Sequence, residues 1–202
     1  MRIGFDAKRV FSNTTGLGNY SRDTINLLSY HFNDNKYFLF TPNKKFKNKL
    51  NFFYKNGNST ICTPNTLINR AFKNYWRSRS IVNDLCKHKI DIYHGLSNEL
   101  PIGIESTNIK TVVTIHDLIF IRFPYLFNVF DRKIYLQKFK SACVRADRII
   151  AISKQTKKDI INYLSIPEEK IDVVYQGCNN IFQNEIPQVK KDKTIIKYKL
   201  PK

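Results

Sequence analysis

Two ionisable side chains, His116 and Asp117, follow directly on a run of β-branched residues near the middle of the chain. Val112, Val113 and Ile115 predict a strand that is buried on both faces, as in a parallel sheet. A buried polar group without a partner costs about 1–3 kcal/mol, so two such groups at the end of a core strand indicate more than packing. Ligands of open parallel sheets lie beyond the carboxyl ends of the strands. We therefore expect His116 and Asp117 to face a ligand crevice.

Three further polar side chains are expected at the same edge of the sheet. His94 follows a predicted strand at 90–93, and Asn98 lies in the loop after it. A lone histidine in such a place is usually structural, but histidines at two neighbouring strand ends favour a binding role for His94. Ser153 follows a predicted strand at 148–152 and is well placed to cap the next helix. Contact with a ligand is the alternative role of Ser153, and one hydroxyl can serve both.

A pair of glycines, Gly16 and Gly18, stands with Asn19 just before a predicted helix. Glycines allow the backbone to approach a ligand closely, and the free N–H groups and dipole of a helix start favour phosphate. The pair does not make a dinucleotide fingerprint, because it comes about ten residues after the strand and Ser21 occupies the third glycine position. A glycine pair of this kind also serves simply to shape a turn.

The elements that must position these residues alternate between short apolar runs and longer amphipathic segments. Strands are predicted at 2–6, 36–41, 59–62, 90–93, 112–115, 148–152 and 171–175. Helices are predicted from about 20 to 31 and at 68–88, 127–147 and 155–164. Residues 7–15 are expected to be irregular. This alternation is typical of an α/β fold, a Rossmann-like doubly wound parallel sheet of about seven strands with helices on both faces.

Composition limits the classes of protein that the chain can belong to. Its 202 residues are 42% hydrophobic, which is enough for an α/β core. Lys and Arg outnumber Asp and Glu by 34 to 16, a net charge of +18, which indicates either an anionic partner or a solvated basic surface. The four cysteines are far apart, which argues against a zinc site or a disulfide framework and favours reduced thiols. We expect a cytoplasmic protein without a secretory leader or a membrane span.

Two basic segments stand outside the alternating pattern. Residues 43–58 interleave lysines with aromatic residues. This segment either touches anionic lipid head groups or packs its aromatic side chains on the sheet, and packing is the favoured interpretation. Residues 181–202 are basic and thinly apolar, and are predicted to be an interdomain linker that follows a domain at 1–180.

Five motifs in order resemble one family. They are G-L-G-N-Y at 16–20, D-I-Y-H-G at 91–95, T-I-H-D-L-I-F at 114–120, R-A-D-R-I-I-A-I-S-K-Q-T-K-K-D-I at 145–160 and E-K-I-D-V-V-Y-Q-G at 169–177. Together they resemble the N-terminal, acceptor-side domain of family-4 retaining glycosyltransferases, which have the GT-B fold of two Rossmann-like domains facing across a cleft. The resemblance covers about residues 1–180.

The resemblance implies an activity and roles for the candidate residues. The activity would be transfer of a sugar from a nucleotide-sugar donor to a hydroxyl acceptor, a surface polysaccharide or a lipid-linked glycan, with retention. Gly16, Gly18 and Asn19 would lie near the donor phosphates, and His116 near the transferred sugar with Asp117 in the same motif. His94, Asn98 and Ser153, which the resemblance does not assign, are expected from their positions at the strand ends to contact the acceptor or sugar. No metal or cofactor is implied, since the nucleotide-sugar is a substrate.

The resemblance also implies what is absent. The paired glutamates of the family's nucleotide-sugar-binding domain are not in the sequence, so we expect half of an enzyme that is inactive without that C-terminal domain. A peripheral position on the inner face of the plasma membrane is consistent with a lipid-linked acceptor. The alternative is a basic nucleic-acid-binding α/β module, which is disfavoured because the positive residues are spread along the chain and no RRM, KH or helix-turn-helix pattern occurs.

Overall fold

A computed structural model of the chain describes residues 1–42, 57–178 and 184–201. Within them, one sheet of seven parallel strands has the order β3-β2-β1-β4-β5-β6-β7. The strands are β1 (Arg2–Asp6), β2 (Lys36–Phe40), β3 (Ser59–Cys62), β4 (Ile92–Gly95), β5 (Lys110–Ile115), β6 (Arg148–Ala151) and β7 (Ile171–Val173). The predicted fold class, a doubly wound parallel α/β sheet, is confirmed.

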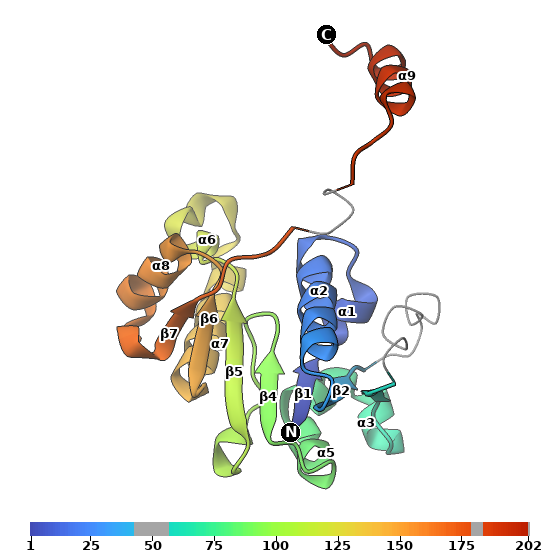
Figure 1. The fold of residues 1–202 in the computed structure, drawn as a ribbon. Helices are drawn as coiled ribbons and strands as arrows, with labels where there is room; N and C mark the ends of the chain where they lie inside the picture. Colours follow the sequence, from blue (N-terminus) through green and yellow to red (C-terminus); the bar gives the residue numbers. More distant parts are fainter. Residues whose placement is uncertain (43–56, 179–183, 202) are drawn as a thin grey trace.

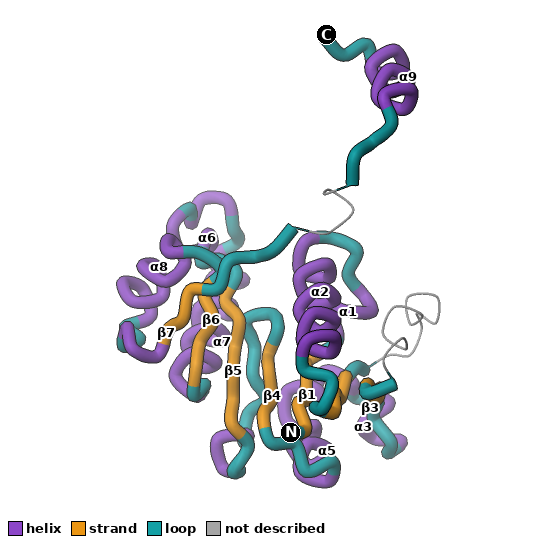
Figure 2. The backbone as a smooth tube through the Cα atoms, in the orientation of Figure 1, coloured by secondary structure: helices purple, strands orange, loops and turns teal. Residues whose placement is uncertain are grey.

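Helices connect the strands and cover the two faces of the sheet (Figures 1 and 2). The longer ones are α2 (Gly16–His31), α7 (Val129–Arg145), α8 (Lys154–Leu164) and α9 (Gln188–Tyr198). The shorter ones are α1 (Lys8–Ser12), α3 (Leu67–Ala71), α4 (Lys73–Tyr75), the π-helical η3 (Trp76–Ser80), α5 (Ile81–Lys87), η4 (Ile104–Ser106), α6 (Ile119–Arg122), η5 (Pro124–Leu126) and η6 (Glu168–Lys170). No helix in the described ranges is both long and apolar enough to cross a bilayer.

Side-chain alternation along the strands builds two cores. In β2, Tyr37 and Leu39 pack with α1 and α2, whereas Phe38 and Phe40 point to the opposite face. This period of two is what a strand buried on both faces requires. The second core is larger and continues over η3, α5, α7 and α8. Both faces of the sheet are therefore covered, as a parallel sheet demands.

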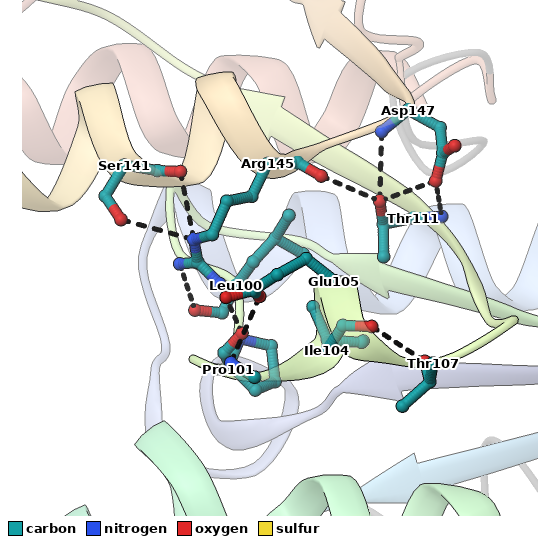
Figure 3. Close-up of polar contacts among 10 residues, drawn as sticks. Leu100, Pro101, Ile104, Glu105, Thr107, Thr111, Ser141, Arg145 and Asp147 are labelled. Atoms are coloured by element: carbon teal, nitrogen blue, oxygen red, sulfur yellow. Dashed lines mark hydrogen bonds and ion pairs between the residues drawn. The ribbon is translucent and has the colours of Figure 1, made fainter.

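A polar network at the amino ends of β5 and β6 joins the end of α7 to the loop that follows β4 (Figure 3). Arg145, in the last turn of α7, donates to the carbonyls of Leu100 and Pro101 and pairs with Glu105 at 3.2 Å. Asp147 accepts from the N–H and the hydroxyl of Thr111 at 2.7 and 2.8 Å. A hollow of about 400 Å³ beside these residues lies at the edge of the sheet opposite the candidate residues, and Arg145, Asp147 and Thr111 in its lining are already paired. We assign it no ligand.

Several predicted elements differ from the structure. Residues 7–15 are not wholly irregular, because they include α1. The fourth strand is β4, two residues later than predicted, so His94 lies inside it. The single helix predicted over 68–88 is broken into α3, α4, η3 and α5.

The break in that helix changes which side chains are buried. A single helix over 68–88 would place Ile68, Phe72 and Tyr75 on one apolar face, but all three are exposed. Trp76 is instead fully buried, with its indole N–H donating to Asp84 at 2.7 Å.

The remaining predictions on organisation meet the structure only in part. No disulfide joins the four cysteines; Cys62 and Cys143 are buried, and Cys86 and Cys178 are exposed. The segment predicted to be a linker contains α9, which buries none of its residues. The basic aromatic segment predicted at 43–58 lies almost wholly outside the described residues.

Candidate functional site

The candidate residues gather where the chain changes direction across the sheet. From β1 the strands proceed one way to β2 and β3, and from β4 the other way to β7. In open α/β sheets the crevice at such a reversal, outside the carboxyl ends of the strands, is where ligands bind. Here β1 ends at Asp6, β4 ends at Gly95 and β5 ends just before His116, and α2 starts at the same edge (Figure 1).

His116 is held on several sides at the end of β5. Its Nε2 lies 2.9 Å from the carbonyl oxygen of Leu96, so this nitrogen carries the proton and donates it. Its Nδ1 lies 3.5 Å from the side-chain amide of Gln176, and its ring meets that of Tyr20 edge-on at 4.8 Å. The side chain is 6% exposed. The imidazole is therefore fixed in one tautomer, with Nδ1 as its hydrogen-bond acceptor.

His94 belongs to a hydrogen-bonded line that crosses three elements. Its Nε2 lies 2.8 Å from the hydroxyl oxygen of Thr114 on β5, and that hydroxyl lies 3.0 Å from the Tyr20 hydroxyl on α2. Because Tyr20 also packs against His116, the two histidines are joined through one tyrosine. Tyr20 and Thr114 are not among the site residues predicted from the sequence. A polar Thr114 within the apolar β5 run was the available signal.

Burial determines the charge of both histidines. Desolvation, aided by the neighbouring His116, lowers the pKa of His94 to about 4. Desolvation also lowers the pKa of His116, against the opposing effects of the Leu96 carbonyl and Asp117. Both rings are thus neutral at pH 7 and act as hydrogen-bonding groups rather than as cations.

Asp117, Asn98 and Ser153 lie at the same edge but have different surroundings. Asp117 is exposed, and its carboxylate accepts from the N–H of Ile119 at 3.3 Å. Asn98 has a left-handed backbone with φ 62°, and its side-chain oxygen accepts from the N–H of His116 at 3.1 Å. Ser153 accepts from the N–H of Thr156 at 3.0 Å, which confirms its capping role. Asn98 therefore positions the backbone of His116.

The glycine pair lies inside the first turn of α2, not before the helix as predicted. A Cβ on Gly18 would lie 2.0 Å from the carbonyl oxygen of Asn13, whereas Gly16 has open space. The Gly18 N–H is already bonded to Thr15 and Asn13. Gly18 is thus a close-packing residue, and Gly16 is the one whose backbone a ligand can approach. The Asn19 side chain accepts from Arg22 at 2.6 Å.

A chain of charges that was not predicted from the sequence runs along the carboxyl ends of β1 and β4. Arg77 of η3 pairs with Asp6 at 2.7 Å and with Glu99 at 2.6 Å, and Glu99 also pairs with Lys138 of α7 at 3.1 Å. Burial works against the charge on Arg77, but the carboxylates of Asp6 and Glu99 outweigh it and raise the pKa of Arg77. This chain anchors η3 and α7 to the edge that carries the histidines.

No group of three or more His, Cys, Asp or Glu side chains in the described part of the chain is placed to hold a metal ion. Beside the charged chain, the carboxyl edge presents two neutral imidazoles, hydroxyls, an amide and the start of a long helix. Such a set suits a polyhydroxylated ligand that also carries phosphate.

Comparison with known proteins identifies the fold and the family of this chain. The fold is that of the N-terminal half of a GT-B protein. A glycosyltransferase from Rickettsia africae ESF-5 is 18% identical with a TM-score of 0.56, over 100% of this chain and 50% of that one. Anabaena Alr3699/HepE, solved with UDP-glucose, is 16% identical with a TM-score of 0.59, over 96% and 50%. The model of Glycosyltransferase Family 4 matches residues 34–180, and the chain belongs to this family.

The same fold also occurs in a protein that is not a glycosyltransferase. UDP-GlcNAc 2-epimerase from Neisseria meningitidis is 14% identical with a TM-score of 0.50, over 96% of this chain and 54% of that one. No curated protein sequence matches the chain. The chain spans about half the length of the solved structures that it resembles.

Proposed function

We propose that this domain forms the acceptor-side wall of an enzyme that transfers a sugar from a nucleotide-sugar to a hydroxyl acceptor, with retention at the anomeric carbon. The observation that carries the proposal is the meeting of His116, His94 and the start of α2 at one strand edge, in a chain of Glycosyltransferase Family 4. UDP-glucose bound to the Anabaena relative supports a nucleotide-sugar donor. The acceptor is a surface polysaccharide or lipid-linked glycan.

The roles follow from the geometry of each group. The neutral His116 orients a hydroxyl of the transferred sugar through Nδ1, which Gln176 contacts in the free protein. The backbone at Gly16, in the first turn of a 16-residue helix, lies close to the donor diphosphate, where the helix dipole favours negative charge. His94, Asn98 and Ser153 keep the strand ends in place beside the acceptor. Transfer then depends on holding both substrates and stabilising the departing diphosphate.

Stabilising that leaving group requires a second wall. We propose that a nucleotide-sugar-binding domain supplies this second wall, and that the 202 residues alone do not turn over a nucleotide-sugar. Product release from radiolabelled UDP-glucose and other nucleotide-sugars by the pure chain would overturn this part of the proposal.

Histidine signals offer a direct test of the site in this chain. The protein has four histidines, and two of them, His31 and His88, belong to the C-terminal ends of helices away from the candidate site. With ¹⁵N-histidine labelling, UDP-glucose or a soluble oligosaccharide should shift the ring signals of His116 and His94 and leave the other two unchanged. Titrations that move none of the four, or all four equally, would contradict the proposed site.

A further inference from the structure

The segment from α6 to the first half of α7 exposes apolar side chains that the fold does not cover. Tyr125, Leu126 and Phe130 are 79%, 66% and 76% exposed. We define the α6–α7 surface by six exposed residues: Phe123, Tyr125, Leu126, Val129, Phe130 and Ile134. Single exposed apolar residues are normal, but a contiguous group on a soluble domain marks an interaction site.

Ring contacts show that these elements form one surface. Phe120 of α6 packs edge-on against Tyr135 and Phe139 of α7, with centroids 5.7 and 5.1 Å apart. Phe123 and Tyr125 lie 6.3 Å apart across the start of η5. Of the 17 residues of α7, only Ala142 and Cys143 are buried, both near its end. The first half of the helix thus buries none of its residues.

The charges on this segment have one predominant sign. Residues 119–140 contain five Lys or Arg and a single acid, Asp131. Lys133 and Lys140 are exposed, and Lys133 stands one helical turn from Val129 and Phe130. Arg122 lies over the ring of Phe123 at 5.8 Å. Apolar side chains intermingled with basic ones are the composition of a surface that lies on anionic lipid.

We propose that the α6–α7 surface docks the protein on an anionic lipid bilayer, with its apolar side chains in the head-group region and Lys133 and Lys140 against lipid phosphates. A second copy of the chain is a poorer occupant, because a self-complementary contact would bring the basic residues of two copies together. Helix α6, which leads into this surface, begins three residues after His116, at the carboxyl edge of the sheet (Figure 1). The proposal rests on this surface alone and does not require sugar transfer.

Binding to vesicles tests the proposal with the whole chain. Sedimentation should recover the protein with equimolar phosphatidylcholine and phosphatidylglycerol, and much less with phosphatidylcholine alone. Lys133→Gln with Lys140→Gln should lower the partition coefficient on anionic vesicles roughly thirtyfold, since each basic residue near the surface strengthens binding about fivefold. Leu126→Ser with Phe130→Ser should lower it at least tenfold on the same vesicles.

Matched controls separate this surface from the general charge of the protein. Tyr30→Ser with Phe32→Ser removes exposed aromatics at the end of α2, and Lys36→Gln with Lys87→Gln removes exposed charges away from α6 and α7. Both should bind as the parent does. Equal losses in control and surface variants would overturn the proposal, as would failure of the parent chain to bind anionic vesicles.

A fluorescent reporter gives an independent reading. Trp76 is the only tryptophan and is fully buried, so Tyr125→Trp adds one exposed signal. Anionic vesicles should shift its emission to the blue, and brominated lipid should quench it while the parent's emission stays constant. If vesicles leave the emission unchanged but it shifts with protein concentration or on adding a nucleotide-sugar-binding domain, a protein partner covers this surface and the lipid proposal is wrong.

Discussion

Lowering the pH from 7 to 5 should weaken the folded state chiefly through His94. In the unfolded chain this imidazole takes up a proton near its ordinary pKa of about 6.5, whereas burial beside His116 holds the folded pKa at about 4. Between these two values only the unfolded chain is protonated, so acid favours unfolding. The free energy of unfolding falls by about 1.4 kcal/mol per pH unit in this window, which is about 2 kcal/mol at pH 5.

Urea unfolding at pH 7, 6 and 5 measures this effect. His94→Gln should remove about 2 kcal/mol of the difference between pH 7 and pH 5, whatever it costs at pH 7. The same loss in the parent protein corresponds to a fall in melting temperature of about 4–8 °C. His116 adds a change of the same sign, because its folded pKa is also lowered by burial.

The control for this measurement is His31→Gln, which replaces an exposed histidine at the end of α2 and should keep the parent's pH dependence. The reasoning is refuted if His94→Gln keeps the full pH dependence, or if NMR titration shows His94 gaining its proton near pH 6.5.

Three further predictions concern packing, charge and catalysis. Gly18→Ala should lower the free energy of unfolding by about 2–3 kcal/mol, because its Cβ would meet a backbone carbonyl at 2.0 Å, whereas Gly16→Ala, in open space, should not be destabilising. Arg77→Met should cost about 3–5 kcal/mol in guanidinium unfolding, since it leaves the buried Asp6 carboxylate unpaired. In the two-domain enzyme, His116→Ala should lower turnover at least tenfold, which is about 1.4 kcal/mol of barrier.

Each of these has a result that would count against it. Equal stability of the two glycine variants would mean that the α1–α2 turn relaxes freely. A loss below 1 kcal/mol on removing Arg77 would mean that water reaches Asp6. Near-normal turnover of His116→Ala would remove this imidazole from the site.

The strands could be predicted from the sequence because their signal is local. Val112, Val113 and Ile115 form a run too short and too β-branched for a surface helix, and the predicted strand matches β5. The prediction of one helix at 68–88 was wrong, because the break in this helix is not a local signal. Periodicity indicates which side chains of a helix share a face, but it does not show that the helix is interrupted at Phe72 and continues through a π-helical stretch. This change directs Trp76 into the core and leaves Ile68 exposed.

The site could be predicted only at its strand ends. His116 was placed from the end of an apolar run, which needs no knowledge of distant residues. The contacts that fix the tautomer and surroundings of His116 do depend on distant residues. Tyr20 lies 94 residues from its partner Thr114, and Gln176 lies 60 residues from His116. The ion pair of Arg77 could not be predicted, because its partner Asp6 is 71 residues away. Long-range pairing of this kind follows from the order of the strands, which composition and spacing do not contain.

The position of β1 has a consequence for synthesis on the ribosome. This strand is made before the other six strands of the sheet, yet it lies in the interior of the sheet between β2 and β4. Roughly 90 further residues must be translated before β4 can pair with it, which takes about 5–20 s at common elongation rates. During that time one side of the nascent strand has unpaired N–H and C=O groups, the kind of edge that recruits neighbouring chains. Faster or slower translation of residues 7–91 should therefore change the yield of folded protein more than the same change made after residue 95.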